Sequence, residues 1–140
     1  MKQVNGYLIL VCSISTSLAG TKAYADCTEE ILSGSYVATN QGTIFDDRLL
    51  TVGQSIFTFD GQGNYTNANS LFMSQGRGAE RPGTATGTYQ VNPDCTGTIT
   101  AANGNVVELV ISFSGDEAHG IVIPPSTQAS RVVTWMFKRQ

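Results

Sequence analysis

The sequence predicts an all-β protein, a single antiparallel up-and-down barrel of eight strands. Segments of strand length alternate between apolar and polar positions, and Gly, Asn, Asp and Pro separate them at short intervals. No run of good helix formers is long enough for a crossover helix. A meander of this kind removes its exposed edges when it closes on itself, which favours a barrel over the alternative, a two-sheet β-sandwich.

The first 25 residues have the pattern of a secretory signal peptide. Lys2 supplies a short positive region, the largely apolar stretch 4–18 follows, and Ala23-Tyr24-Ala25 places small residues before a cleavage site. The apolar stretch is too short and too interrupted for a permanent membrane span. We therefore expect a signal peptide at 1–25, a protein that is secreted or periplasmic, and no stable membrane anchor after cleavage.

Removal of residues 1–25 would leave 26–140 as one β-barrel domain. Lys2 and Lys22 leave with the signal, so eight basic residues become six against eleven acidic ones. The formal net charge then changes from −3 to −5. An acidic surface repels phosphate, so no nucleic-acid partner is expected.

Two of the three cysteines, Cys27 and Cys95, remain after this removal. In an oxidising compartment an isolated pair is most simply a disulfide. Metal ligation by the two thiolates is the weaker alternative, because structural metal sites need three or four ligands. We expect a Cys27–Cys95 disulfide and no metal.

The elements follow one another at regular intervals. One helical turn is expected at 28–32, with Thr28 as its cap and Glu29 and Glu30 at its positive end. Eight strands are then expected at 35–41, 49–60, 65–74, 83–92, 96–102, 105–113, 118–123 and 128–139.

Turn-forming residues separate these strands. Asp60–Asn64 and Asn92–Asp94 contain the Gly, Pro, Asn and Asp residues that tight turns use, and Asn103-Gly104 is typical of a type I′ turn. A polar, glycine-rich loop occupies 75–82. Pro124-Pro125 ends a strand, because proline cannot donate to a strand ladder.

Four segments carry a family resemblance: Cys27, Gly34–Tyr36, Phe57–Asn64 and Gly87–Thr98. They resemble a group of small exported bacterial β-barrel proteins and, more widely, the calycin class of lipocalin-like and allene-oxide-cyclase barrels. The resemblance covers most of 26–140. It rests on turns and a disulfide, so it implies a fold and no particular activity.

The start of the first strand is similar to that of lipocalins. Gly34-Ser35-Tyr36 resembles their Gly-x-Trp, with tyrosine in place of tryptophan. The resemblance implies that a late basic residue, Arg131 or Arg139, caps the closed end of the barrel.

Two titratable residues are weak candidates for catalysis. His119, the single histidine, can act as an acid or base, although an exposed strand-end position explains it better. Glu108 interrupts the apolar segment 106–111. Strand alternation favours Glu108 in water, whereas the opposite register would place it in the lumen and raise its pKa.

Aromatic residues are the main candidates for ligand contact. An eight-stranded barrel either encloses a small ligand or fills its interior with its own side chains, and both alternatives remain open. If a cavity exists, the expected ligand-binding residues are Tyr36, Phe57, Phe59, Tyr89 and Trp135.

Three functions are compatible with these features. The first is a non-catalytic exported barrel that binds a small apolar molecule in its lumen. One alternative is a cofactor-free cyclase or isomerase acting on an apolar substrate, in which Glu108, His119 or a buried tyrosine would supply the polar group. The other is a structural or surface-interaction module. The chain has no P-loop, dinucleotide fingerprint, metal-binding histidine pair or nucleophile elbow, so no cofactor is expected.

Overall fold

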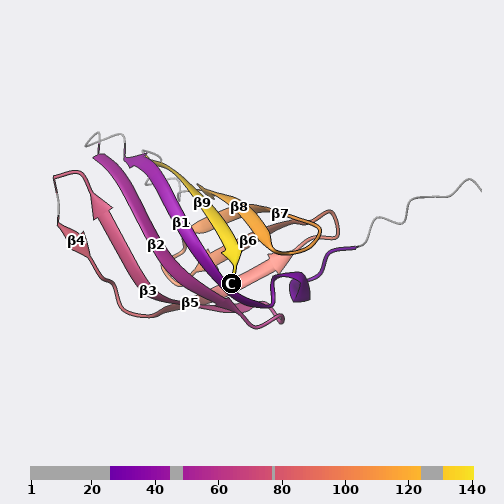
Figure 1. The fold of residues 1–140 in the computed structure, drawn as a ribbon. Coiled ribbons are helices and arrows are strands. Elements are labelled where there is room, and N and C mark those ends of the chain that lie inside the picture. The colour runs from indigo at the N-terminus through magenta and orange to yellow at the C-terminus, as the bar shows by residue number, and fades with distance from the viewer. Residues whose placement is uncertain (1–25, 45–48, 77, 124–130) are drawn as a thin grey trace, which may run out of the picture.

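The structure is a computed structural model that describes residues 26–44, 49–76, 78–123 and 131–140 (Figure 1). The signal peptide predicted at 1–25 and the strand end predicted at Pro124-Pro125 lie outside the described residues.

Eight long antiparallel strands close into one barrel, and a two-residue strand, β4, adds to β3. Each long strand pairs with the next long strand along the chain, including β2 with β3. The pairing of β1 with β9 joins the first strand to the last and closes the barrel. The predicted closed barrel is therefore confirmed, and β4 lies in the segment predicted as a loop. The strands are β1 (Gly34–Ile44), β2 (Leu49–Phe59), β3 (Asn64–Ser74), β4 (Ala79–Glu80), β5 (Ala85–Val91), β6 (Thr96–Ala101), β7 (Val106–Ile111), β8 (Glu117–Ile123) and β9 (Arg131–Arg139).

The predicted helical turn is a short 3-10 helix, η1 (Glu29–Leu32). The expected side-chain cap is wrong, because Thr28 makes no capping hydrogen bond through its hydroxyl. Its backbone is extended, and its carbonyl accepts from the Ile31 amide at 3.0 Å, so a backbone bond closes the turn. Glu29 and Glu30 lie in the first turn as predicted.

Alternate strand residues point into the barrel and form one core. Aromatic side chains dominate one half of it, where Phe59 packs edge-on against Tyr36 at 5.4 Å and Tyr89 at 5.0 Å between ring centroids. Phe137, at 6.2 Å from Phe59, extends the same cluster. Rings in such edge-to-face pairs contribute more than their buried area alone.

The two ends of the barrel differ. At the closed end, the β2–β3, β5–β6 and β7–β8 turns meet η1 and the end of β9, and Figure 1 shows η1 beside the C-terminus. The opposite, open end carries the β3–β5 and β6–β7 connections. Most of the large buried side chains belong to the closed half, so space for another molecule lies toward the open end.

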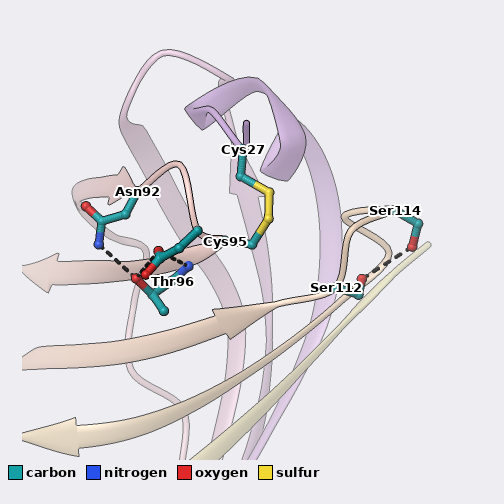
Figure 2. The surroundings of a disulfide bond; sticks show 7 residues. Cys27, Asn92, Cys95, Thr96, Ser112 and Ser114 are labelled. Atoms are coloured by element: carbon teal, nitrogen blue, oxygen red, sulfur yellow. Dashed lines mark hydrogen bonds between the residues drawn. A yellow bond between two sulfur atoms is a disulfide. The ribbon is translucent and has the colours of Figure 1, made fainter. Parts of the chain in front are cut away.

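The disulfide lies at the closed end of the barrel. Figure 2 shows Cys27, just before η1, joined to Cys95 in the β5–β6 hairpin; their Cα atoms are 5.1 Å apart and 68 positions separate them in sequence. Cys95 adopts a left-handed φ of 63°, and Asp94 Oδ1 accepts from the Thr96 amide at 3.0 Å. The Thr96 hydroxyl and amide lower the pKa of Asp94 by stabilising its carboxylate. The predicted disulfide and turn are confirmed.

Candidate functional site

The open half of the barrel contains a cavity of about 380 Å³. Its rim consists of exposed residues of the open end, including Pro82, Gly83 and Asn103. Its floor is formed by Phe57 and Phe137, both buried. Small-molecule sites in proteins are typically concave, mostly apolar spaces of about this size.

Aromatic side chains form one side of the cavity around Trp135. The indole stacks on Phe137 with centroids 5.8 Å apart, and it meets Phe57 edge-on at 5.6 Å. Phe72 faces it at 6.4 Å. Phe72 lies where a Cβ on Gly53 would be, so a larger residue at Gly53 would displace the ring. These rings give a flat apolar ligand several surfaces to stack on.

A bulge in β3 brings Phe72 into the lumen. Ala68 lies opposite Ile56 and Leu71 opposite Gln54, so β3 has one residue more than β2 in this stretch. Asn69 takes a left-handed φ of 53° there. Because one residue is added, the inward positions change from odd numbers before the bulge to even numbers after it.

Polar side chains are interspersed among the apolar residues lining the cavity. Asn40, Asn67 and Ser70 line it, and the Ser70 hydroxyl donates to Asn67 Oδ1 at 2.8 Å. None of the described lining residues carries a formal charge. The cavity is therefore suited to an uncharged molecule that has a polar group on an apolar body.

Tyr65 is the titratable residue among the described lining residues. Its ring stacks on Phe57 at 5.2 Å and covers Gly87, where a Cβ would clash with it. Burial raises the pKa of Tyr65 because the phenolate is poorly solvated there. Tyr65 is consequently a neutral hydrogen-bonding group at physiological pH.

Alkaline unfolding is the expected consequence of the tyrosine environments. Burial, the largest cause in each case, raises the pKa of Tyr36, Tyr65 and Tyr89 above the ordinary value near 10. The folded chain therefore keeps protons that the unfolded chain loses, and its stability falls as pH rises above about 10. Tyrosine ionisation, followed by absorbance at 295 nm, should require a higher pH in the folded chain than in the urea-unfolded chain. It should coincide with loss of the near-ultraviolet circular dichroism. Ionisation of these tyrosines in the intact fold at the pH of the unfolded chain would contradict this.

The five aromatic residues predicted to contact a ligand divide into two groups. Phe57 and Trp135 line the cavity. Tyr36, Phe59 and Tyr89 are buried and do not belong to its lining; they pack together toward the closed end. A ligand contact in the cavity therefore remains a prediction for Phe57 and Trp135 alone.

Glu108 and His119 both lie on the outer face of the barrel. Glu108 is exposed, as strand alternation predicts. His119 has a side chain 60% exposed, and its Nε2 lies 2.9 Å from Glu117 Oε1. Both residues border a groove of about 980 Å³ across β6 to β9 and β1. Neither lines the lumen cavity, so neither can act directly on a molecule held there.

The outer groove is less suited to a small ligand than the lumen. Its apolar residues include Val110, Ile121 and Met136, whose exposed fractions are 66%, 52% and 46%. Side chains this exposed still contact water on one side, whereas the lumen floor is sealed by buried rings. A small ligand would therefore bury more of its surface in the lumen cavity than in the outer groove.

The sequence did not indicate Asn40 as a lining residue, and Phe72, one of the aromatic residues available to line a cavity, was not among the five predicted ligand contacts. Asn40 follows alternating small and polar residues on β1, where hydropathy does not distinguish the two faces. Phe72 lies after the bulge, so simple alternation from Tyr65 places it outside. The sequence signal for the bulge was the asparagine at position 69, because asparagine tolerates the left-handed φ that the bulge residue adopts.

Arg139 caps the closed end, as the lipocalin resemblance implies. Its guanidinium donates from Nη1 to the Ser33 carbonyl at 2.5 Å and from Nη2 to the Ile31 carbonyl at 2.7 Å. It also lies 5.1 Å above the ring of Tyr36, whose hydroxyl donates to the Gly115 carbonyl. The Gly-x-Tyr segment and the late arginine therefore meet at the closed end of the barrel.

Comparisons with known proteins report on the fold. No protein-family model matches the chain, and no curated protein matches it in sequence. The chain is similar in fold to designed β-barrels. A redesigned barrel, mFAP0, bound to DFHBI has 16% identity and a TM-score of 0.46, over 78% of this chain and 99% of that chain.

Two further designed proteins have comparable similarity. EF1p2_mFAP2b bound to DFHBI has 14% identity and a TM-score of 0.47, over 79% of this chain and 94% of that one. A de novo designed fluorescence-activating β-barrel has 15% identity and a TM-score of 0.44, over 80% of this chain and 96% of that one. The site assignments in this chain rest on its own geometry.

The described residues also bear on membrane and metal sites. Among them, no helix is long and apolar enough to cross a membrane. Over the same ranges, no group of three His, Cys, Asp or Glu side chains is gathered in a way that could hold a metal ion.

Proposed function

We propose that this chain is a small exported β-barrel that binds a small, uncharged, apolar molecule in its lumen without catalysing a reaction. The observation that carries the proposal is the cavity of about 380 Å³ in the open half, with Trp135, Phe57 and Phe72 around it. A barrel that served only as a rigid module gains stability by filling such a space, because cavities are costly. Export rests on the predicted signal peptide and agrees with the Cys27–Cys95 disulfide.

The absence of charge among the described lining residues supports a neutral ligand. A charged molecule would lose its hydration on entering an aromatic cavity without gaining an ion pair. Of the three candidates for acid–base chemistry, Glu108 and His119 lie on the outer face, and the third, a buried tyrosine, corresponds in the cavity to Tyr65, whose pKa burial raises so that it stays neutral. Binding without reaction is therefore better supported than the cyclase or isomerase alternative.

Ligand binding is tested with N-phenyl-1-naphthylamine, a neutral probe whose fluorescence rises in apolar surroundings. We expect saturable binding to the purified protein and transfer of excitation from Trp135 to the probe. Native mass spectrometry of the same protein should also show whether a co-purified small molecule is present. Failure of the probe to bind, together with an unliganded mass, would contradict the proposal.

Filling the cavity should abolish much of this binding. Ala101 lines the cavity on β6, so Ala101→Phe places a ring in the space that the probe would occupy. We expect the probe's affinity to fall about 10-fold or more, which corresponds to about 1.4 kcal/mol. Thr100→Phe is the matched control, because Thr100 is the preceding residue on β6 and is exposed. Equal affinities of the two variants would place the probe outside the lumen.

A further inference from the structure

The walls of the lumen cavity differ in polarity. The wall formed by β1, β2 and β3 carries the polar residues Asn40, Thr51, Asn67 and Ser70 among the rings of Phe57, Tyr65 and Phe72. The facing wall, from β6 to β8, is apolar along its strands; its lining residues are Ile99, Ala101, Val107 and Val122. A molecule that fills the cavity therefore meets aliphatic side chains from the strands of one wall, and aromatic rings interspersed with hydrogen-bonding groups on the other.

Asn40 is the most buried of the amides on the polar wall. It is 6% exposed and lies between Trp135 on β9 and Gly53 on β2 in the strand register. Its Nδ2 is 3.0 Å from the place that a Cβ on Gly53 would occupy, beside the ring of Phe72. The amide of Asn40 is thus held next to the aromatic side of the cavity.

No hydrogen bond joins the side chain of Asn40 to the other described residues, whereas Asn67 accepts one from Ser70. A carboxamide has two N–H donors, and those of Asn40 are open to the cavity that this residue lines, so a molecule that displaces water from them leaves them unpaired unless it supplies an acceptor. The cavity therefore holds a donor that needs an acceptor from the molecule that enters.

A second inward-pointing polar atom, on β2 but outside the lining of the cavity, is also without a partner. Ser55, 3% exposed, follows Gly53 by two positions on β2 and points inward opposite Ala38. Its Oγ is buried and makes no hydrogen bond in the described part of the chain. Such buried, unpaired groups are uncommon in folded proteins, but Ser55 is not among the residues that line the cavity and so carries no contact to a molecule there.

We propose that the ligand of this barrel is a flat aromatic or conjugated ketone whose carbonyl oxygen accepts a hydrogen bond from the side-chain amide of Asn40. This inference rests on the proposed function, lumen binding of a small apolar molecule. The planar body stacks among Trp135, Phe57 and Phe72, and the carbonyl faces the amide of Asn40 beside these rings. A ketone suits this arrangement because it has no donor that would be left unpaired against the apolar wall.

The test uses two probes of nearly the same shape, 9-fluorenone and fluorene, which differ by a carbonyl in place of a methylene. Quenching of Trp135 fluorescence gives the Kd of each probe for the full chain. We expect fluorenone to bind about 10-fold more tightly, the effect of one hydrogen bond in a desolvated site. This comparison within the wild-type protein does not depend on any variant folding correctly.

Asn40→Leu then identifies the group responsible. Leucine keeps the approximate shape of asparagine and removes the amide, so the preference for fluorenone should disappear while fluorene still binds. Thr39→Leu, a change at the exposed preceding position, should keep the preference. Far-ultraviolet circular dichroism of both variants establishes that they are folded.

The outcomes separate this inference from the proposed function. Equal affinities of the two probes for the wild-type protein, or a preference for fluorenone that survives in Asn40→Leu, would overturn the role of Asn40 and leave lumen binding intact. Binding of neither probe would overturn the ketone inference, and the proposed function would fall with it if N-phenyl-1-naphthylamine also fails to bind and the protein carries no co-purified molecule.

Discussion

Loss of the Cys27–Cys95 disulfide is expected to lower the free energy of unfolding by about 4 kcal/mol, the value that chain-entropy arguments give for a loop of this length. The disulfide joins residues 68 positions apart and holds the segment before η1 against the β5–β6 hairpin. The Cys27→Ser, Cys95→Ser double variant should show this loss in urea unfolding, with Cys12 replaced by serine in every sample to prevent exchange.

The matched control is chemical. Dithiothreitol should lower the stability of the disulfide-bonded protein by about the same amount and should leave the double variant unchanged, because that variant has no disulfide to reduce. A double variant as stable as the parent protein would show that the backbone bond from the Cys27 amide to the Pro93 carbonyl, 3.2 Å long, and the surrounding packing hold this end without the disulfide.

The strands and their closure were predictable because the sequence alternates where one face is buried. Val107, Leu109 and Ile111 on β7 alternate with exposed positions, so the outward direction of Glu108 followed from the pattern. The disulfide was predictable by parity once residues 1–25 were set aside. The strand faces follow from the local alternation of hydropathy, and the disulfide follows from the number of cysteines. Both can be read from a single sequence.

The lumen was less predictable because it depends on which strands carry small or polar inward residues. On β1 the inward residues after Tyr36 are Ala38 and Asn40, and neither differs in hydropathy from its outward neighbours in a way that assigns a face. On β3 the bulge reverses the alternation before Phe72. The residues predicted as ligand contacts were chosen because they are aromatic. Residue type alone does not distinguish a ring that packs in the filled closed half from one that lines the cavity in the open half.

Arg139 is expected to be the most important single side chain at the closed end, and Arg139→Met should cost about 3 kcal/mol. The guanidinium satisfies the carbonyls of Ile31 and Ser33 in and after η1 and approaches that of Gly115 at 3.2 Å. Hydrogen bonds to charged groups contribute about 1.5–3 kcal/mol each, and the side chain is 32% exposed, so we expect less than their sum.

Lys138→Met is the matched control, because it removes the same charge from the neighbouring, exposed residue of β9. It should change the free energy of unfolding by no more than about 0.5 kcal/mol. Arg139→Lys keeps the charge and loses the planar fork, so it should recover only part of the loss. Indistinguishable urea midpoints for Arg139→Met and Lys138→Met would show that net charge, and no specific cap, is what Arg139 contributes.

The Arg139 cap and the disulfide should also be coupled, because both hold the same short segment. Without the disulfide, η1 is free to separate from the barrel, and the Ile31 and Ser33 carbonyls then lose their fixed position over β9. Arg139→Met should therefore cost about 1 kcal/mol less in the disulfide-free background than in the parent protein, which a double-mutant cycle measures directly. Strict additivity would mean that η1 stays in place through its own packing, with Leu32 as the buried anchor.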